Sequence, residues 1–422
     1  MRGNNQAISL ALPDSASTAS AKAGDLRFFL LIGALYFTQG LPMGLSMEAV
    51  PVMMRQSGVS MDIIALVPLA GLPWIIKFLW APMVDNRWKP GLGRRKSWIV
   101  PMQTILTACL ILLAFVSLEG TGLWIAVAAL VIGTIASATQ DTATDGLAAE
   151  QLAGRGLAYA NALQVGGMMA GFMIGGGGVL MVADTLGQQG IFLLLALVPL
   201  LTIGLTLSWR EPSRPEKAQQ SQKARLANTF RRPGVFLLLI LAFIYGGAHA
   251  GGLSVSKIFL VDLGWSNQQT GLIATVSGLV MLALGCPLGS VLTARNRWIA
   301  MGVGMALAAV SFALWALIAG GVLPASWPIV LAAISVLSVA SGFIAVAAAT
   351  IIMAFGGAGE QAGTDVTVLQ SANVFGEMAI AGLVVWFAGR TGYAVTFAGA
   401  AATLVLALLF VSRAARALLV TR

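Results

Sequence analysis

The sequence predicts an all-α, polytopic membrane protein whose twelve transmembrane helices form two six-helix bundles. Hydrophobic residues account for 58% of its 422 residues and charged residues for 10%, and its mean hydropathy is +0.87. Soluble domains carry roughly 25% charged residues, so this composition indicates a chain that lies mostly within a bilayer. The segments that are apolar and long enough to cross a bilayer are 27–52, 61–84, 97–117, 121–146, 156–180, 190–209, 235–256, 268–293, 297–319, 327–355, 362–387 and 392–412.

The polar segments divide the chain into four parts. Residues 1–26 are rich in Ser and Ala and lack the apolar core of a signal peptide, which predicts a disordered cytoplasmic tail. Residues 27–209 are then the first bundle, 210–234 a charged cytoplasmic linker, and 235–422 the second bundle. Two bundles joined in this way are typical of a transporter that rocks around a site near the bilayer midplane.

The basic residues predict the orientation of the chain. With the N-terminus inside, the cytoplasmic segments and span ends hold all 25 Lys and Arg residues except Arg55, Lys77, Lys257 and Arg390. This distribution follows the positive-inside rule, so we expect a multi-pass protein of the cell inner membrane with both termini in the cytoplasm. The rule also accounts for the net charge of +9 without a nucleic-acid partner.

The sequence lacks the residues that several kinds of chemistry require. The two cysteines, Cys109 and Cys286, lie in different spans, and we interpret both as small buried hydrophobic residues. His249 is the single histidine, which excludes a zinc site built on two histidines, and the sequence has no Gly-x-x-x-x-Gly-Lys segment for ATP. We therefore predict no metal site, no cofactor and no enzymatic activity.

Lys77 is the strongest indication of a functional site. It lies about two turns inside an apolar segment that ends at Asp85, just before a basic loop. An ionisable side chain within a span is costly and usually has a partner, which makes Lys77 a site candidate.

Glycines indicate helices that pack closely or change shape. Gly167, Gly171 and Gly175 recur every four residues in the fifth span, a spacing that lets a neighbouring backbone approach, with or without motion. In the seventh span, the run 245–252 places four glycines around His249. This run suggests an interrupted helix whose freed backbone groups face a cavity.

Four motifs resemble one branch of a known family. They are Tyr36-Phe37-Thr38-Gln39-Gly40-Leu41-Pro42, the segment 72–85, Gly93-Arg94-Arg95-Lys96-Ser97-Trp98, and Gln140-Asp141-Thr142-Ala143-Thr144-Asp145. Together they resemble the muropeptide permease branch of the major facilitator superfamily, and within it the shorter siderophore permeases of the rhizobactin and pyochelin type. The resemblance implies a secondary transporter that imports a ferric siderophore by alternating access, with protons as the coupling ion. A muropeptide or other amphiphile permease is the alternative, and a receptor or assembly factor without transport is a third interpretation.

Two features depart from the muropeptide permeases. Those proteins tend to be longer and to carry extra spans, whereas twelve spans fill this chain. They also tend to have a basic residue in span five, where this sequence has Gln164. The missing charge disfavours an anionic sugar–peptide as the substrate.

The resemblance implies a gate in the loop between spans two and three. Asp85 can meet a helix N-terminus or an arginine when the cytoplasmic side is shut, and such a contact must break on opening. We assign gating to Asp85, Arg94 and Arg95, with an ordinary positive-inside loop as the alternative.

Three carboxylates are candidates for proton coupling. Asp141 and Asp145 share one helix face near the cytoplasmic end of span four, with Asp145 expected nearer to water. A structural ion pair between spans two and four, with Lys77 as the cation, is the alternative. Glu377 is the first candidate because it lies well inside span eleven, and a hydrogen-bonded helix contact is its alternative.

The remaining candidates would line a cavity for a large, partly aromatic ligand. The aromatic residues that we expect to line this cavity are Tyr36, Trp74, Trp80, Tyr245, Trp315 and Trp386. We assign substrate binding to Tyr36, Gln39, Trp74, Lys77, Gln164, Tyr245, His249 and Asn373. We expect a monomer in the lipid bilayer with a small-molecule substrate.

Overall fold

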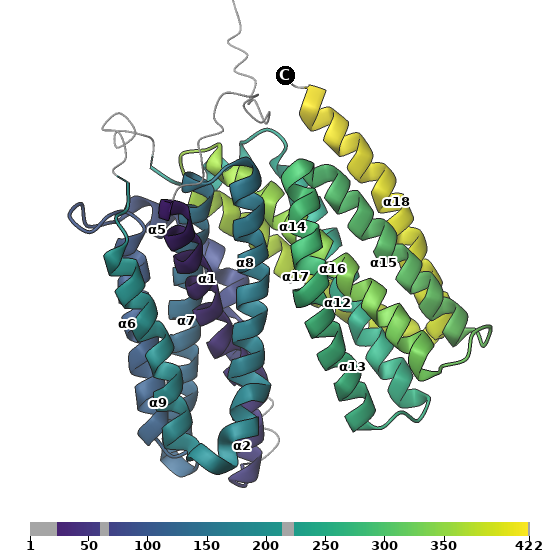
Figure 1. The fold of residues 1–422 in the computed structure, drawn as a ribbon, viewed down its shortest axis with the longest axis horizontal. Helices are drawn as coiled ribbons and strands as arrows, with labels where there is room; N and C mark the ends of the chain where they lie inside the picture. The colour runs from purple at the N-terminus through teal and green to yellow at the C-terminus, as the bar shows by residue number, and fades with distance from the viewer. Residues whose placement is uncertain (1–22, 60–66, 213–222, 421–422) are drawn as a thin grey trace, which may run out of the picture.

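The computed structural model describes residues 23–59, 67–212 and 223–420, and their regular structure is helical. Figure 1 shows two groups of helices side by side, with the first half of the chain (purple to teal) in one group and the second half (green to yellow) in the other. Eight described helices are long and apolar enough to cross a bilayer, and shorter apolar stretches lie in the seventh and twelfth spans.

The first group begins at the N-terminal helix and ends before the linker. Its elements are α1 (Ala23–Gly44), the π-helical η1 (Leu45–Ala49), α2 (Val50–Gln56), the 3₁₀ turn η2 (Val67–Gly71), α4 (Pro73–Ile76), the 3₁₀ turn η3 (Lys77–Leu79), α5 (Ala81–Asn86), α6 (Lys96–Phe115), α7 (Gly120–Gln151), α8 (Gly154–Met173), the π-helical η4 (Ile174–Gly178) and α9 (Val179–Ser208). Within α9 the backbone turns at Gly187, whose φ of 61° separates the fifth span from the sixth.

The second group follows the linker. Its elements are α11 (Leu226–Phe230), α12 (Val235–Asp262), α13 (Asn267–Val280), the π-helical η5 (Met281–Gly285), α14 (Cys286–Arg295), α15 (Arg297–Ala319), α16 (Trp327–Gly357), α17 (Ala362–Thr391) and α18 (Tyr393–Val420).

The second span differs from the continuous helix that we predicted over 61–84. Residues 61–66 lie outside the described chain, and the described part is broken into η2, α4, η3 and α5. Pro73 begins α4, and Pro82 has no N–H to donate to the carbonyl of Phe78, so the helical ladder cannot pass these points intact. Lys77 therefore lies on a 3₁₀ turn at a break rather than inside an α-helix.

The seventh span also differs from its prediction. The glycine run does not interrupt the helix, because α12 continues from Val235 to Asp262. Its glycines instead let α17 approach: a Cβ on Gly246 would lie 2.4 Å from the carbonyl oxygen of Asn373, and a Cβ on Gly376 would lie 2.1 Å from that of Phe243. The two helices are thus packed backbone against backbone.

Close packing explains the glycine repeat of the fifth span. A Cβ on Gly171 would lie 2.0 Å from the carbonyl oxygen of Phe37, and a Cβ on Gly175 would lie 2.4 Å from that of Leu41. The approach is mutual, because a Cβ on Gly40 of α1 would lie 2.1 Å from the carbonyl oxygen of Met168. These small residues let α1 and α8 pack at backbone contact.

Replacing Gly171 by alanine should therefore destabilise the protein. The added methyl must push α1 away from α8, and overpacking of this kind costs about 1–3 kcal/mol. Gly177 is the matched control, because a Cβ there meets nothing within 4 Å. We expect a lower melting temperature in detergent for Gly171→Ala and an unchanged or higher one for Gly177→Ala. Equal melting temperatures for the two variants would contradict this packing.

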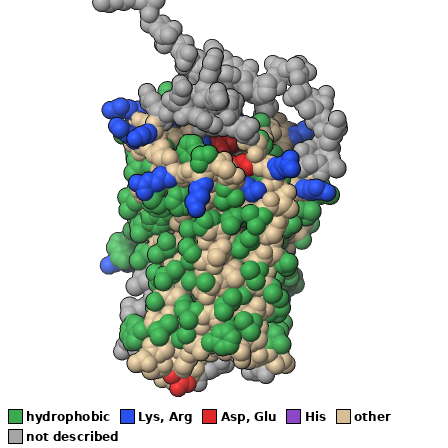
Figure 2. Space-filling model, turned by 90° about the vertical axis from the view of Figure 1, so that its left-hand side faces the viewer, with side chains coloured by type: hydrophobic (Ala, Val, Ile, Leu, Met, Phe, Trp, Pro, Cys, Tyr) green, Lys and Arg blue, Asp and Glu red, His purple; other side chains and the backbone are tan. Residues whose placement is uncertain are grey.

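Basic side chains gather at one end of the molecule. Figure 2 shows most of the Lys and Arg of this face there, whereas hydrophobic side chains mixed with other side chains and backbone cover the middle of the face and acidic side chains lie at the opposite end. We call the end with the Lys and Arg the basic end and define it by Arg87, Lys89, Arg94, Arg95 and Lys96, which lie where α5 ends and α6 begins. It is the end that we predict to face the cytoplasm.

The two groups of helices meet at the basic end. Thr364, at the start of α17, donates its backbone N–H and its hydroxyl to Asp85 of α5, each at 2.7 Å. Nearby, a Cβ on Gly357 of α16 would lie 2.2 Å from the carbonyl oxygen of Ala149 of α7. Toward the opposite end, the helices of the two groups spread apart (Figure 1). The structure is thus closed at the basic end.

Candidate functional site

Lys77 lies at the centre of a buried polar cluster between the two groups of helices. Its side chain is 1% exposed, and its Nζ forms an ion pair with Oδ2 of Asp141 of α7. The same Nζ donates to Oε1 of Gln370 of α17 at 2.8 Å, and it lies 5.0 Å from the ring centroid of Trp74. The ammonium group thus joins span two, span four and span eleven.

Asp145 lies in the same cluster, one turn along α7 from Asp141. Its Oδ1 accepts a hydrogen bond of 2.7 Å from the hydroxyl of Tyr36 and one of 2.9 Å from Nε2 of Gln164. Its Oδ2 is buried without a hydrogen bond among the described residues. We expected Asp145 to lie nearer to water than Asp141, and this was wrong: Asp145 is fully buried because α1, α7 and α8 surround it.

The cluster holds more negative than positive charge. Lys77 is its one cation among the described residues, against the carboxylates of Asp141 and Asp145. An uncompensated buried charge is strongly disfavoured, so the cluster gains if one carboxylate binds a proton or if a cationic group enters.

Five of the residues that we assigned to substrate binding lie around this cluster: Tyr36, Gln39, Trp74, Lys77 and Gln164. Gln39 is fully buried and donates to Oγ1 of Thr144 at 3.4 Å. We did not assign Gln370 to the site, although it shares a helix face with Asn373 and Glu377. Its role as partner of Lys77 depends on a contact across 293 residues, which the sequence does not reveal.

The other residues that we assigned to substrate binding, and Glu377, lie in the second group of helices. Asn373 donates to the carbonyl oxygen of Ala242 at 3.3 Å and so ties α17 to α12. Glu377 is half-buried, and within the described chain its carboxylate forms neither a hydrogen bond nor an ion pair. The side chain of His249 lies outside the described residues.

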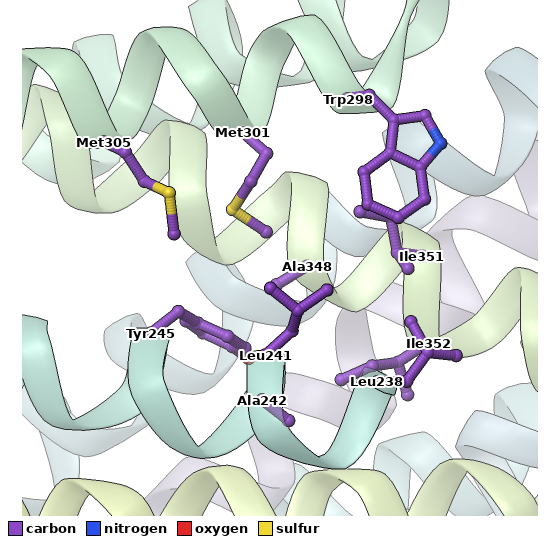
Figure 3. A pocket seen from close by; sticks show the side chains of 10 residues that line it. All are labelled: Leu238, Leu241, Ala242, Tyr245, Trp298, Met301, Met305, Ala348, Ile351 and Ile352. Atoms are coloured by element: carbon purple, nitrogen blue, oxygen red, sulfur yellow. The ribbon is translucent and has the colours of Figure 1, made fainter. Parts of the chain in front are cut away.

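Tyr245 does not lie in the central cluster. Figure 3 shows its ring beside Leu241 and across from Met305, at a small apolar cavity of about 20 Å³ between α12, α15 and α16. Trp315 and Trp386 do not lie in the central cluster either. Trp315 is fully buried against Phe259 and Phe397, whereas Trp386 is 57% exposed. Trp80 donates from its indole nitrogen to Oγ1 of Thr139 of α7 at 3.1 Å. Of the six aromatic residues that we expected in a wall, Tyr36 and Trp74 are the ones seen to contact the cluster in the described chain.

A second network closes the basic end, around Asp85. Its Oδ1 forms ion pairs with Arg94 at 3.1 Å and with Arg95 at 2.8 Å, while its Oδ2 accepts both hydrogen bonds from Thr364. The contact between this aspartate, two arginines and a helix N-terminus is the geometry that we expected of a shut gate. Arg94 and Arg95 also each form an ion pair with Glu150 at 2.7 Å. We had not assigned Glu150 to the gate.

The electrostatics of this network favour the charged form of Asp85. Burial alone would raise the pKa of Asp85, but Arg95, Arg94 and the hydrogen bonds from Thr364 together hold its pKa below the ordinary value. For Arg95, burial works against the charge, and Glu150 and Asp85 nevertheless raise its pKa. Both partners therefore stay ionised at any physiological pH.

The second described part of the linker, which begins at residue 223, contacts both groups of helices at the basic end. Ala224 exchanges two hydrogen bonds with the side chain of Asn86, at 2.7 and 2.8 Å. Arg225 likewise exchanges two with the side chain of Gln361, at 3.0 and 3.2 Å. These contacts add to those of Asp85 on the closed side.

The fold and the membrane helices together define a class of protein: a multi-pass membrane protein with the major facilitator fold, in which twelve transmembrane helices form two six-helix bundles. The structure of the E. coli fucose:proton symporter matches with a TM-score of 0.70 at 14% identity, over 93% of this chain and 99% of the symporter. That of the human organic anion transporter MFSD10 matches with a TM-score of 0.68 at 15% identity, over 92% of this chain and 99% of the transporter.

Among particular proteins, the sequence is similar to the anhydromuropeptide permease of Escherichia coli K12. The two are 29% identical over 268 residues, which cover 62% of this chain and 54% of the permease, so the match spans about half of that longer protein. A family model described as acetyl-coenzyme A transporter 1 matches residues 27–134. The match to this permease agrees with the resemblance to the muropeptide permease branch, and the comparisons do not bear out the finer resemblance to siderophore permeases.

Proposed function

We propose that this chain is a secondary transporter that moves a muropeptide-type amphiphile across the inner membrane by alternating access, with protons as the coupling ion. The observation that supports this most strongly is the position of Lys77, a buried cation that contacts Asp141 of one bundle and Gln370 of the other. A substrate group that takes the place of either partner would change the contact between the bundles. Binding and gating would thereby be linked.

The chemistry of the cluster suits a sugar–peptide. Such a substrate offers a carboxylate to the ammonium of Lys77, and amides and hydroxyls to Tyr36, Gln39 and Gln164. The absence of a basic residue at position 164 counted against an anionic substrate. In the structure, Gln164 is engaged by Asp145, and Lys77 is paired with Asp141. A substrate carboxylate would therefore take the place of Asp141 at Lys77, and the cluster would bind protons as that substrate enters.

We further propose that Asp145 carries the coupled proton. Lys77 already neutralises Asp141, whereas Asp145 forms no ion pair with a described residue and accepts hydrogen bonds from the neutral donors Tyr36 and Gln164. A proton on Asp145 would remove the excess charge of the closed cluster. Glu377 remains a second candidate, because it lies half-buried in α17 without a cationic partner among the described residues.

The structure is closed at the basic end, which we propose faces the cytoplasm. It then corresponds to a state that receives substrate from the opposite side, as import requires. The contacts of Asp85, Ala149 and Ala224 would all separate when the substrate is released inside.

Uptake by cells that lack their own muropeptide permease tests the proposal. Cells that express this chain should accumulate radiolabelled anhydromuropeptide, and cells with an empty vector should not. A labelled ferric siderophore serves as the second substrate. Accumulation of the siderophore without the muropeptide would overturn the proposal in favour of the siderophore interpretation, and accumulation of neither would overturn both.

A further inference from the structure

The second bundle contains a large apolar crevice that is separate from the central cluster. It lies between α12, α15, α17 and α18 and has a volume of about 680 Å³. Ile244, Phe312, Leu383, Ala400 and Leu404 represent the four helices that line it, and its remaining lining is almost entirely apolar. We call it the lateral crevice.

The lateral crevice opens on the outer surface of the bundle. Leu383, Trp386 and Leu406 line it and are all more than half exposed. Its inner part reaches Leu241 and Met305, which also line the small cavity of Figure 3. In a bilayer, this opening faces the acyl chains of lipids.

A cationic side chain lies at the end of the crevice farthest from the basic end. Helix α17 begins at the basic end and ends at Thr391, so Arg390 in its last turn lies at the opposite surface. The guanidinium of Arg390 lies 3.8 Å from the ring centroid of Trp386, which lines the crevice. Arg390 is exposed and forms no ion pair with a described residue. Asp262, the last residue of α12, accepts a hydrogen bond from the hydroxyl of Tyr393.

This combination is the geometry of a phospholipid site: an apolar slot at membrane depth, with an aromatic residue at the level of the head groups and a cation that forms no ion pair within the described chain. Arg390 is also one of the few basic residues away from the cytoplasmic segments, so the positive-inside rule does not explain it. We propose that the lateral crevice binds an anionic phospholipid of the leaflet opposite the basic end, with its phosphate at Arg390 and an acyl chain between α17 and α18.

Two variants separate the head-group contact from the acyl-chain contact. Arg390→Gln removes the charge at the rim. Gly399→Leu should fill the crevice, because Gly399 lines it and a Cβ there meets nothing within 4 Å. Lys257→Gln is the matched control, since Lys257 is an exposed cation of α12 that does not line the crevice.

Native mass spectrometry of the purified full chain measures the binding. The protein is mixed with equal amounts of phosphatidylglycerol and phosphatidylcholine of the same acyl chains. We expect wild type and Lys257→Gln to retain phosphatidylglycerol preferentially, Arg390→Gln to lose this preference at least about fivefold, and Gly399→Leu to retain less of both lipids. The proposal would be overturned if Arg390→Gln kept the wild-type lipid preference, or if Lys257→Gln lost that preference to the same extent. A dimer of the chain in place of the lipid adduct would also overturn it.

Discussion

Replacing Lys77 by alanine is expected to abolish uptake, with transport lower than that of wild type by about 100-fold or more. The substitution leaves Asp141 buried without its cation, and breaking a buried ion pair costs about 3–5 kcal/mol. It also removes the contact to Gln370 that joins the bundles. Uptake of labelled anhydromuropeptide measures the effect, normalised to the amount of protein in the membrane.

The control and a second variant separate loss of function from loss of fold. Lys257→Ala removes an exposed lysine of α12 and should transport like wild type. In Lys77→Ala/Asp141→Ala both partners are gone, so the cluster keeps the net charge of wild type, carried by Asp145, and the membrane level should recover while uptake stays lost. Wild-type uptake by Lys77→Ala, or recovery of uptake in the double variant, would contradict a role for Lys77 in transport.

Replacing Asp85 by asparagine should open the basic end. The change removes two ion pairs, with Arg94 and Arg95, and weakens the hydrogen bonds from Thr364 that hold α17 against α5. Cysteines introduced singly at Ala143 and Thr367, which are buried beneath this network, should therefore react with a soluble maleimide about tenfold faster in Asp85→Asn than in the Asp85 background. Unchanged labelling rates would show that these contacts do not hold the gate shut.

The pH dependence of the gate follows from the same network. Because the pKa of Asp85 is lower in the closed state than its ordinary value, the contact stabilises closure above that ordinary value and is lost only as the pH falls toward the lowered pKa. Wild-type labelling rates at the two cysteine positions, corrected for the reagent's own pH dependence, should thus be flat between about pH 6 and pH 8. A tenfold rise toward pH 6 would mean that another group controls the gate.

Composition and charge distribution were sufficient to predict the fold. The helices are long because a bilayer demands about 20 apolar residues per crossing, and the basic residues collect at one end, as their distribution along the sequence predicted. The glycine spacing in span five likewise predicted close packing, which the approach of Gly171 to Phe37 confirms. These are properties of short stretches of sequence, which can be interpreted without knowing the partners.

The site was only partly predictable. An intramembrane lysine and a pair of aspartates one turn apart pointed to the cluster, but the contacts of Lys77 to Gln370 and of Asp85 to Thr364 join residues 293 and 279 positions apart. The break at Lys77 was missed because a proline in an apolar run predicts a kink or an end without fixing its form. The glycines of span seven were misinterpreted because the same residues permit an interrupted helix or a closely packed one, and only the position of α17 decides.

The most direct test of the proposed mechanism is the proton flux that accompanies substrate. Purified protein is reconstituted in liposomes that contain a pH-sensitive dye, anhydromuropeptide is added outside, and internal acidification is recorded together with uptake. Wild type should acidify the lumen as substrate enters. Asp145→Asn should exchange substrate across the membrane, yet it should neither move protons nor concentrate substrate. Measuring Glu377→Gln in the same way shows whether Glu377 also carries the coupled proton. Uptake without acidification, unchanged in both variants, would contradict a permease driven by protons through these carboxylates.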